Sequence, residues 1–280
     1  MTLPLKKLYV DSKFKTKDSV SNSNFKIELP VTVYMPNNAI FTIDDICIPH
    51  SWYSIEKDIN DTLYVHILTV GLGGYSFFVS LPEGNYTGDL LKLRLQEKLD
   101  AYGDDNISMN GKFKVSYEPK THSITITITT NESFKILSDY ELTTALDGYY
   151  TATYDRLNPA SLNDVIKNFE AKTNSSNNPF ESGFIDLQSI NNIYISSPNL
   201  GSFTTLGSRG EQNIIKKVPV SSDFGYMIID RVTSNHDYLE CSKVTLKTVE
   251  FHLKDSHGRY IPLHNANVSF SIIFSIWNGD

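Results

Sequence analysis

Alternating apolar and polar residues run through both ends of the chain. Residues 25–29 alternate before Pro30, residues 40–48 form a longer apolar run closed by Pro49, and residues 63–70 follow. The last third returns to this pattern at 191–196, 213–220, 224–230, 243–254 and 267–277. In the final segment Val268, Phe270, Ile272, Phe274 and Ile276 share one face, opposite Ser269, Ser271 and Ser275. Period-two runs bounded by breakers predict β-strands.

Two segments have the period of a helix instead. Residues 88–102 follow Thr87, which can cap a helix start, and carry Leu91, Leu95 and Leu99 as one stripe before Gly103. A second helix is predicted at 162–170, with Ser161 as N-cap and Phe169 on the apolar face.

The first helix belongs to a small mixed unit. Residues 75–129 give strand, helix, strand, strand, in which 112–117 and 123–129 form a hairpin. We therefore expect an α/β insertion with connecting helix and loops at 71–188, a jelly-roll domain at 24–70 and 189–280, and an N-terminal arm at 1–23. About eight strands then remain, the number in a jelly roll. The predicted fold is mainly β, a single jelly roll (eight-stranded antiparallel sandwich) with this insertion, and a sandwich of another Greek-key order is the alternative.

Composition narrows the class of protein. The aromatic residues are 16 Tyr and 15 Phe beside only 2 Trp, which suits pleated, half-buried surfaces. A formal charge of −7 gives no general electrostatic reason to bind nucleic acid. No run approaches the roughly 18 to 20 apolar residues that span a bilayer. The first residues lack an apolar signal core, so we expect a protein made in its host cell without a secretion signal.

The N-terminal stretch is locally basic. It carries Lys6, Lys7, Lys13, Lys15 and Lys17 against Asp11 and Asp18. Two interpretations stay open: a partly ordered terminus, or an arm that holds a neighbouring subunit or faces packaged DNA.

The sequence offers no set of groups for catalysis, a cofactor or a metal. His252, His257 and His264 fall close together, but a turn at 255–258 explains their crowding. Cys47 and Cys241 lie in strand-like runs and are expected as free thiols. We therefore predict no enzyme, no cofactor and no metal site, since an enzyme acting on polysaccharide would need converging carboxylates.

Several predicted loops carry residues that could contact a ligand. Tyr149, Tyr150 and Arg209 are the candidate contacts, and Asn174 to Asn178 form an Asn-rich loop. They motivate an alternative function, a receptor- or glycan-binding β-sandwich module.

Blocks at both ends of the chain resemble a known family. They are Tyr9–Ser12, Ser23–Pro30, Ile43–Trp52, Pro82–Thr87, Ile193–Leu200, Ile214–Val220 with Phe224-Gly225, Val249–Gly258 and Val268–Ile272. Together they look like the penton-type minor capsid proteins of Polintons and virophages, the mavirus-like double-stranded DNA viruses. Residues 140–188 lie outside this resemblance.

The resemblance implies a structural role. A protein of this kind is a jelly roll with an outward domain, and five copies close an icosahedral vertex of the virion. Its implied partners are itself as a homopentamer and the double jelly-roll major capsid protein. Packaged DNA, through the arm, and a host receptor are further expected partners.

Overall fold

A computed structural model describes residues 3–69, 73–105, 112–143, 160–170, 172–188, 190–201, 205–207, 210–231 and 237–277. The contacts divide the chain into two compact units. The first unit is Met1–Trp52 with Ile190–Asp280, and the second unit is Tyr53–Ser189.

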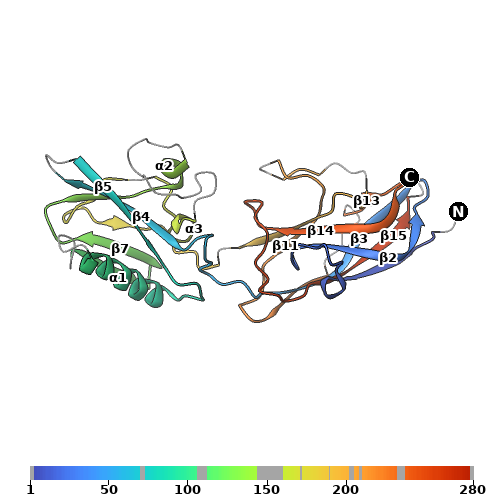
Figure 1. Ribbon diagram of the computed structural model, residues 1–280, viewed down its shortest axis with the longest axis horizontal. Coiled ribbons are helices and arrows are strands. Elements are labelled where there is room, and N and C mark those ends of the chain that lie inside the picture. Colours follow the sequence, from blue (N-terminus) through green and yellow to red (C-terminus); the bar gives the residue numbers. More distant parts are fainter. Residues whose placement is uncertain are drawn as a thin grey trace. The chain divides into compact units, whose positions relative to one another are not determined.

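The first unit is a sandwich of two antiparallel sheets. Sheet A has the order β1-β15-β3-β12, with β13 also paired to β3, and sheet B has the order β11-β10-β14-β2. Their bounds are β1 Lys7–Asp11, β2 Asn24–Tyr34, β3 Ala39–Pro49, β10 Asn192–Ser196, β11 Ile214–Pro219, β12 Met227–Asp230, β13 Leu239–Glu240, β14 Thr245–Lys254 and β15 Ser269–Ile276. Figure 1 shows the blue strands of the chain's beginning beside the orange and red strands of its end.

The order of these strands confirms the predicted jelly roll. Numbered one to eight along the chain with the short β13 left out, the strands fall as 1-8-3-6 in sheet A and 2-7-4-5 in sheet B. In each sheet, strands from the first four along the chain therefore alternate with strands from the last four, as two interlocked Greek keys require. The insertion lies between the third and fourth of these strands.

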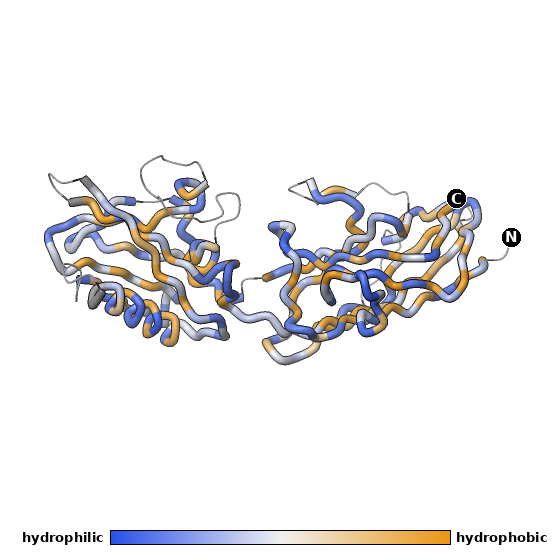
Figure 2. Tube along the Cα trace, in the orientation of Figure 1, coloured by the Kyte–Doolittle hydropathy of each residue, from blue (hydrophilic) through white to orange (hydrophobic). Residues whose placement is uncertain are grey.

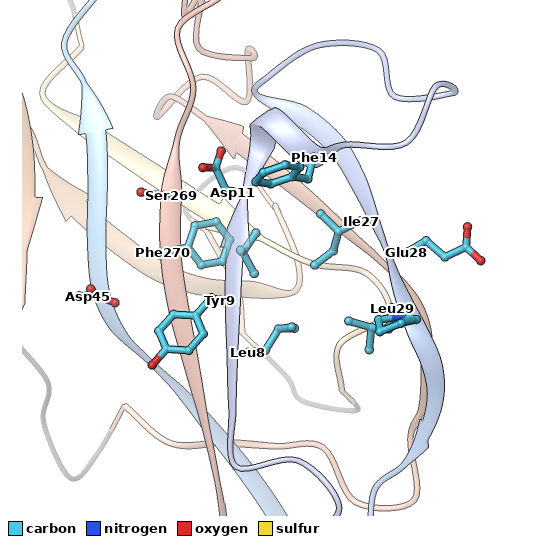
Figure 3. A pocket seen from close by; sticks show the side chains of 12 residues that line it. Leu8, Tyr9, Asp11, Phe14, Ile27, Glu28, Leu29, Asp45, Ser269 and Phe270 are labelled. Carbon is cyan, nitrogen blue, oxygen red and sulfur yellow. The ribbon is translucent and has the colours of Figure 1, made fainter.

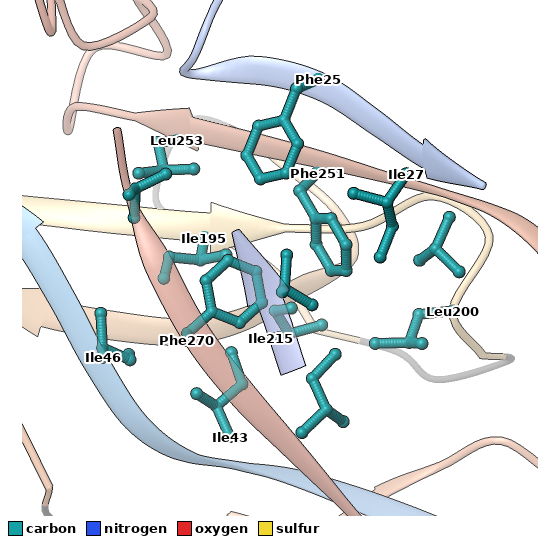
Figure 4. Packing of buried hydrophobic residues seen from close by; sticks show 14 of the residues in the cluster. Phe25, Ile27, Ile43, Ile46, Ile195, Leu200, Ile215, Phe251, Leu253 and Phe270 are labelled. Atoms are coloured by element: carbon teal, nitrogen blue, oxygen red, sulfur yellow. The ribbon is translucent and has the colours of Figure 1, made fainter. Parts of the chain in front are cut away.

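The two sheets bury one apolar core. Phe25, Phe251 and Phe270 are buried, and their side chains come from β2, β14 and β15 (Figure 4). The rings of Phe251 and Phe270 meet edge to face, with centroids 5.0 Å apart. Orange and blue segments alternate along several strands in Figure 2, because successive side chains point to opposite faces. The predicted inward face of β15 is confirmed, since Val268, Phe270, Ile272 and Phe274 are all buried.

The second unit combines two small sheets with helices. The sheets are β5-β4-β8 and β6-β7-β9. The bounds are β4 Thr62–Thr69, β5 Gly73–Ser80, β6 Phe113–Glu118, β7 Ser123–Ile128, β8 Ser133–Ile136, β9 Phe180–Glu181, α1 Gly88–Asp105, α2 Asp139–Thr143 and α3 Asn163–Ile166. The Leu91, Leu95 and Leu99 stripe of α1 is buried in the same core as β6 and β7. The hydroxyl of Thr87 accepts the Leu90 N–H at 3.2 Å, as predicted for the cap.

The expected domain boundaries differ from these units. Residues 53–70 were expected in the jelly roll, but β4 pairs with β5 and β8 and therefore belongs to the second unit. The first partner of β4, the strand β5, follows it directly in the chain and the second, β8, lies further on, but the apolar run at 63–70 by itself indicates neither pairing.

The second predicted helix is shorter than expected. It ends at Ile166, because Lys167 takes a left-handed conformation with φ of 52°. The Asn168 side chain then donates to the Ile136 carbonyl at 3.2 Å, and Phe169, expected on the apolar face, is exposed. The Asn-rich loop also differs from expectation, since Asn174 is buried and pairs with Phe134.

The basic N-terminal stretch is not a separate arm. β1 pairs with β15 over its whole length, and the 3-10 helix Ser12–Phe14 (η1) follows it directly. Leu8 and Val10 face the core while Lys7, Tyr9 and Asp11 alternate with them. The lysines of this stretch therefore lie on a strand and a loop of the sandwich.

Candidate functional site: a groove between two edge strands

An apolar groove opens between the two sheets of the sandwich, along one side. β1 is the outer strand of sheet A and β2 is the outer strand of sheet B. Between them lies a cavity of about 460 Å³ (Figure 3). Its lining comprises Leu8, Tyr9, Val10, Asp11, Phe14, Ile27, Glu28, Leu29, Pro30, Asp45, Ser269 and Phe270.

The alternation of the two edge strands builds this groove. Leu8 and Val10 of β1 and Ile27 and Leu29 of β2 point their apolar side chains between the sheets, where Phe270 of β15 also lies. At an ordinary position in the sandwich another strand would cover such side chains on both flanks. Here the two sheets end, so part of the apolar surface stays accessible.

Two aromatic side chains flank the groove and are exposed to solvent. Tyr9 is 76% exposed and Phe14 is 74% exposed. Phe14 is held beside the groove by η1, whose N-cap Asp11 accepts the Lys13 N–H at 2.8 Å. Large exposed aromatics next to an apolar hollow are typical of protein-binding surfaces.

Carboxylates give the groove a negative rim. The lining contains Asp11, Glu28 and Asp45 and contains no Lys, Arg or His. Glu28 forms an ion pair with Lys247 at 3.1 Å, and the hydroxyl of Ser271 donates to Asp45. A negative rim disfavours phosphate and favours basic or neutral partners.

A β-bulge in β3 positions the acidic pair Asp44-Asp45. The register of β3 with β15 shifts between Phe270 and Ile272, so both acids lie opposite one partner residue. Asp44 pairs with Lys7 at 2.6 Å, while Asp45 accepts from Ser271. The bulge thus brings Asp45 to the groove, which the sequence alone did not indicate.

The five candidate lysines do not gather at one site. The Lys7 ammonium lies 5.2 Å from the Tyr9 ring centroid, and its hydrogen bond to Asp44 raises the pKa of Lys7. Lys15 donates to the Asn22 side chain at 2.6 Å, and Lys6, Lys13 and Lys17 are exposed. Tyr149, Tyr150 and Arg209 lie outside the described residues.

The histidines near the C-terminus each have a separate local partner. His252 contacts Glu250 at 2.8 Å, His257 lies 3.9 Å from Asp255, and His264 contacts the Ser51 carbonyl oxygen at 2.7 Å. Over the described ranges no three His, Cys, Asp or Glu side chains come together as a metal site would require. Cys47 and Cys241 are free thiols, as predicted.

The groove was missed at the level of sequence because its walls come from segments far apart in the chain. β1 and β2 are edge strands of different sheets, and Phe270 comes from β15. The available signal was local: Tyr9 and Phe14 are large aromatics in a stretch that also contains several lysines.

The fold can be compared with those of known proteins. No helix in the described part of the chain is long and apolar enough to cross a membrane. No protein-family model matches the chain, and no curated protein matches it. Among solved structures, the chain is similar to the crystal structure of the selenomethionine-labelled mavirus penton protein, at 13% sequence identity and a TM-score of 0.49, over 97% of this chain and 99% of that chain.

Proposed function

We propose that this protein is a non-enzymatic minor capsid subunit of the penton type, five copies of which close an icosahedral vertex. One observation carries the proposal. The blocks that resemble penton-type minor capsid proteins at the two ends of the chain coincide with β1, β2, β3, β10, β11, β14 and β15 of the jelly roll. The resemblance therefore follows the strands that build the sandwich.

The sandwich is suited to this role on physical grounds. Jelly rolls occur in viral capsids, where a rigid double sheet carries loops that meet neighbours. A closed assembly also needs exposed surfaces able to bind other subunits, and the groove between β1 and β2 supplies one. The virion vertex is accordingly its proposed location, with the major capsid protein as its neighbour.

Packaged DNA is a weaker candidate partner. Lys7 and Lys15 are engaged with Asp44 and Asn22, and the stretch that carries them is a folded part of the sandwich. A DNA-binding arm needs several free cations on an extended segment.

A second function, binding of a receptor or glycan, is supported by the second unit. Tyr140, Phe169 and Phe184 are exposed there, and aromatic faces stack on sugar rings and on protein partners. The full-length protein on a glycan array tests this function. Signal above background that Phe169→Ser and Phe184→Ser remove would support it, and no signal would count against it.

The mass of the full-length protein in solution tests the main proposal. Light scattering over a range of salt and protein concentrations should give a particle near five times 31.6 kDa. Peptide mass spectrometry should also find the chain in purified virus particles. A strict monomer that is absent from the particles would contradict the proposal.

A further inference from the structure

The edges of sheet B are protected against pairing with other strands. The stretch 16–21 lies along β2: the Thr16 N–H donates to the Lys26 carbonyl at 2.8 Å, and the Lys26 N–H donates to the Ser19 hydroxyl at 2.9 Å. At the other edge, β11 contains Lys216, Lys217 and ends at Pro219. Covering loops, lysines and prolines are the usual means of blocking an edge strand.

Among the residues that the structure describes, the β12 edge of sheet A has no covering loop, lysine or proline. The His50 N–H donates to the Tyr226 carbonyl at 2.9 Å, and Ile228 is paired with Ile48. In an antiparallel ladder the bonded positions alternate, so the backbone groups of Met227 and Ile229 point away from β3. Their side chains are 46% and 51% exposed. This edge therefore presents an apolar strand with outward backbone donors and acceptors.

The β1 edge of sheet A carries one lysine, Lys7, but is open at Tyr9. The Ser12 N–H donates to the Val268 carbonyl and the Phe274 N–H donates to the Lys6 carbonyl, both at 2.9 Å. The same alternation then directs the backbone groups of Tyr9 away from β15. Tyr9 lies next to the groove, so this edge has an apolar hollow beside it.

We propose that the β12 edge of one copy pairs with the β1 edge of a second copy, so that sheet A continues from subunit to subunit. This inference rests on the proposed function, because it names the surfaces by which the copies of a vertex ring would meet. The two edges are different surfaces, and a contact between different surfaces can close a ring. Within sheet A β1 and β12 run antiparallel, since each neighbouring pair between them is antiparallel. A continued sheet keeps that arrangement.

The two edges are complementary in shape. The groove beside β1 is concave and apolar with the carboxylates Asp11, Glu28 and Asp45. On the side of β12 the exposed aromatics Phe224 and Tyr226 precede the strand. Lys217 and Arg231 are also exposed there, and Lys216 pairs with both Asp230 and Asp237 beside the further acid Asp223. A second copy therefore offers exposed apolar side chains to an apolar groove.

Proline variants test the pairing without breaking the sandwich. Tyr9→Pro and Ile229→Pro each remove an N–H that points outward, a position where an edge strand tolerates proline. Each variant keeps one intact edge. Alone, each should be monomeric in light scattering at concentrations where the wild type forms pentamers. Mixed in equal amounts, they should form a dimer and nothing larger, through the single intact pair of edges.

Controls separate this inference from the proposed function. Phe169→Ser, an exposed aromatic of the second unit, should keep the wild-type mass. Tyr9→Lys and Ile229→Lys repeat the experiment with charge in place of proline if a proline variant loses the wild-type circular dichroism spectrum. If both single variants still form pentamers of the wild-type mass, the inference is overturned and the vertex role stays intact. An Ile229 variant that stays monomeric while the Tyr9 variant still forms pentamers would show that the β1 edge is not needed for assembly and would also overturn the inference. A wild type that is monomeric at every concentration would overturn the pentamer and this pairing together.

Discussion

Ser12 and Val268 are joined by two hydrogen bonds that fasten the beginning of the chain to its last strand. The Ser12 N–H donates to the Val268 carbonyl at 2.9 Å, and the Val268 N–H donates to the Ser12 hydroxyl at 3.0 Å. Both residues are completely buried. The pair fixes β1 as an edge strand of sheet A and so forms one wall of the groove.

Ser12→Ala should destabilise the first unit. The substitution leaves the buried Val268 N–H without its acceptor, which costs about 1–3 kcal/mol. Urea denaturation followed by intrinsic fluorescence measures the loss in free energy of unfolding. Ser256→Ala, at an exposed turn of the same unit, is the matched control and should change little. An equal effect of the two substitutions would contradict the role of the Ser12 hydroxyl.

Gly88→Ala should destabilise the second unit. A Cβ at this first residue of α1 would overlap the ring of Tyr117, so the helix or the ring must shift. We expect a loss of about 1–3 kcal/mol in the free energy of unfolding, as for other overpacked sites. The loss should shrink in a Tyr117→Ala background, because the obstructing ring is then absent. Lys98→Ala on the same helix is the control, and an unchanged loss in the double variant would refute this explanation.

The stability of the second unit should fall as the pH decreases below about 6.5. Burial lowers the pKa of His66, and Lys135 lowers it further, while Glu141 acts in the opposite direction. An unfolded histidine titrates near pH 6.5, so below that pH the unfolded state binds a proton that the folded state still excludes. The contribution of His66 is therefore complete above about pH 6.5 and is lost as the pH falls towards its lowered pKa.

His66→Gln tests this dependence. Thermal unfolding at about pH 7.5 and about pH 5 should show a larger drop in stability for the wild type than for the variant. His264→Gln replaces an exposed histidine of the first unit and should keep the wild-type drop. If His66→Gln loses as much stability between the two pH values as the wild type does, groups other than His66 cause the pH dependence.

The two cysteines should differ in reactivity. Cys241 is completely buried, and burial raises the pKa of its thiol to about 12, whereas Cys47 is partly exposed on β3. Because the thiolate is the nucleophile, an alkylating reagent at about pH 8 should modify Cys47 first and Cys241 only after denaturation. Peptide mass spectrometry over time follows both sites. Equal rates in the folded protein would contradict the burial of Cys241.

Local patterns predicted those parts of the fold that depend on neighbours in the sequence. The Leu91, Leu95 and Leu99 stripe with its Thr87 cap specifies α1, because a helix buries one face and its hydrogen bonds are local. The alternation at Val268 to Phe274 specifies β15 and its inward face. The number of strands left a jelly roll and a sandwich of another Greek-key order open, the family resemblance favoured the jelly roll, and the pairing of the strands confirmed it.

Tertiary contacts decided where local signals were absent or misleading. The lysines around Leu8 and Val10 suggested an arm, but pairing with β15 makes the stretch a strand. The apolar run of β4 fitted either unit until its partners β5 and β8 were known. The second helix stops at Ile166 because Lys167 takes a left-handed conformation, and the Asn168 side chain then donates a hydrogen bond to Ile136 of another segment.

The sequence by itself determined that this protein is mainly β, with a capped helix in an insertion. Those properties follow from periodicity and residue chemistry, which are local. Only the tertiary structure decided the groove between β1 and β2 and the open edges at Tyr9 and Ile229. Strand pairing joins residues that are distant in the chain, and which backbone groups remain outside a sheet is known only when every strand has found its neighbours.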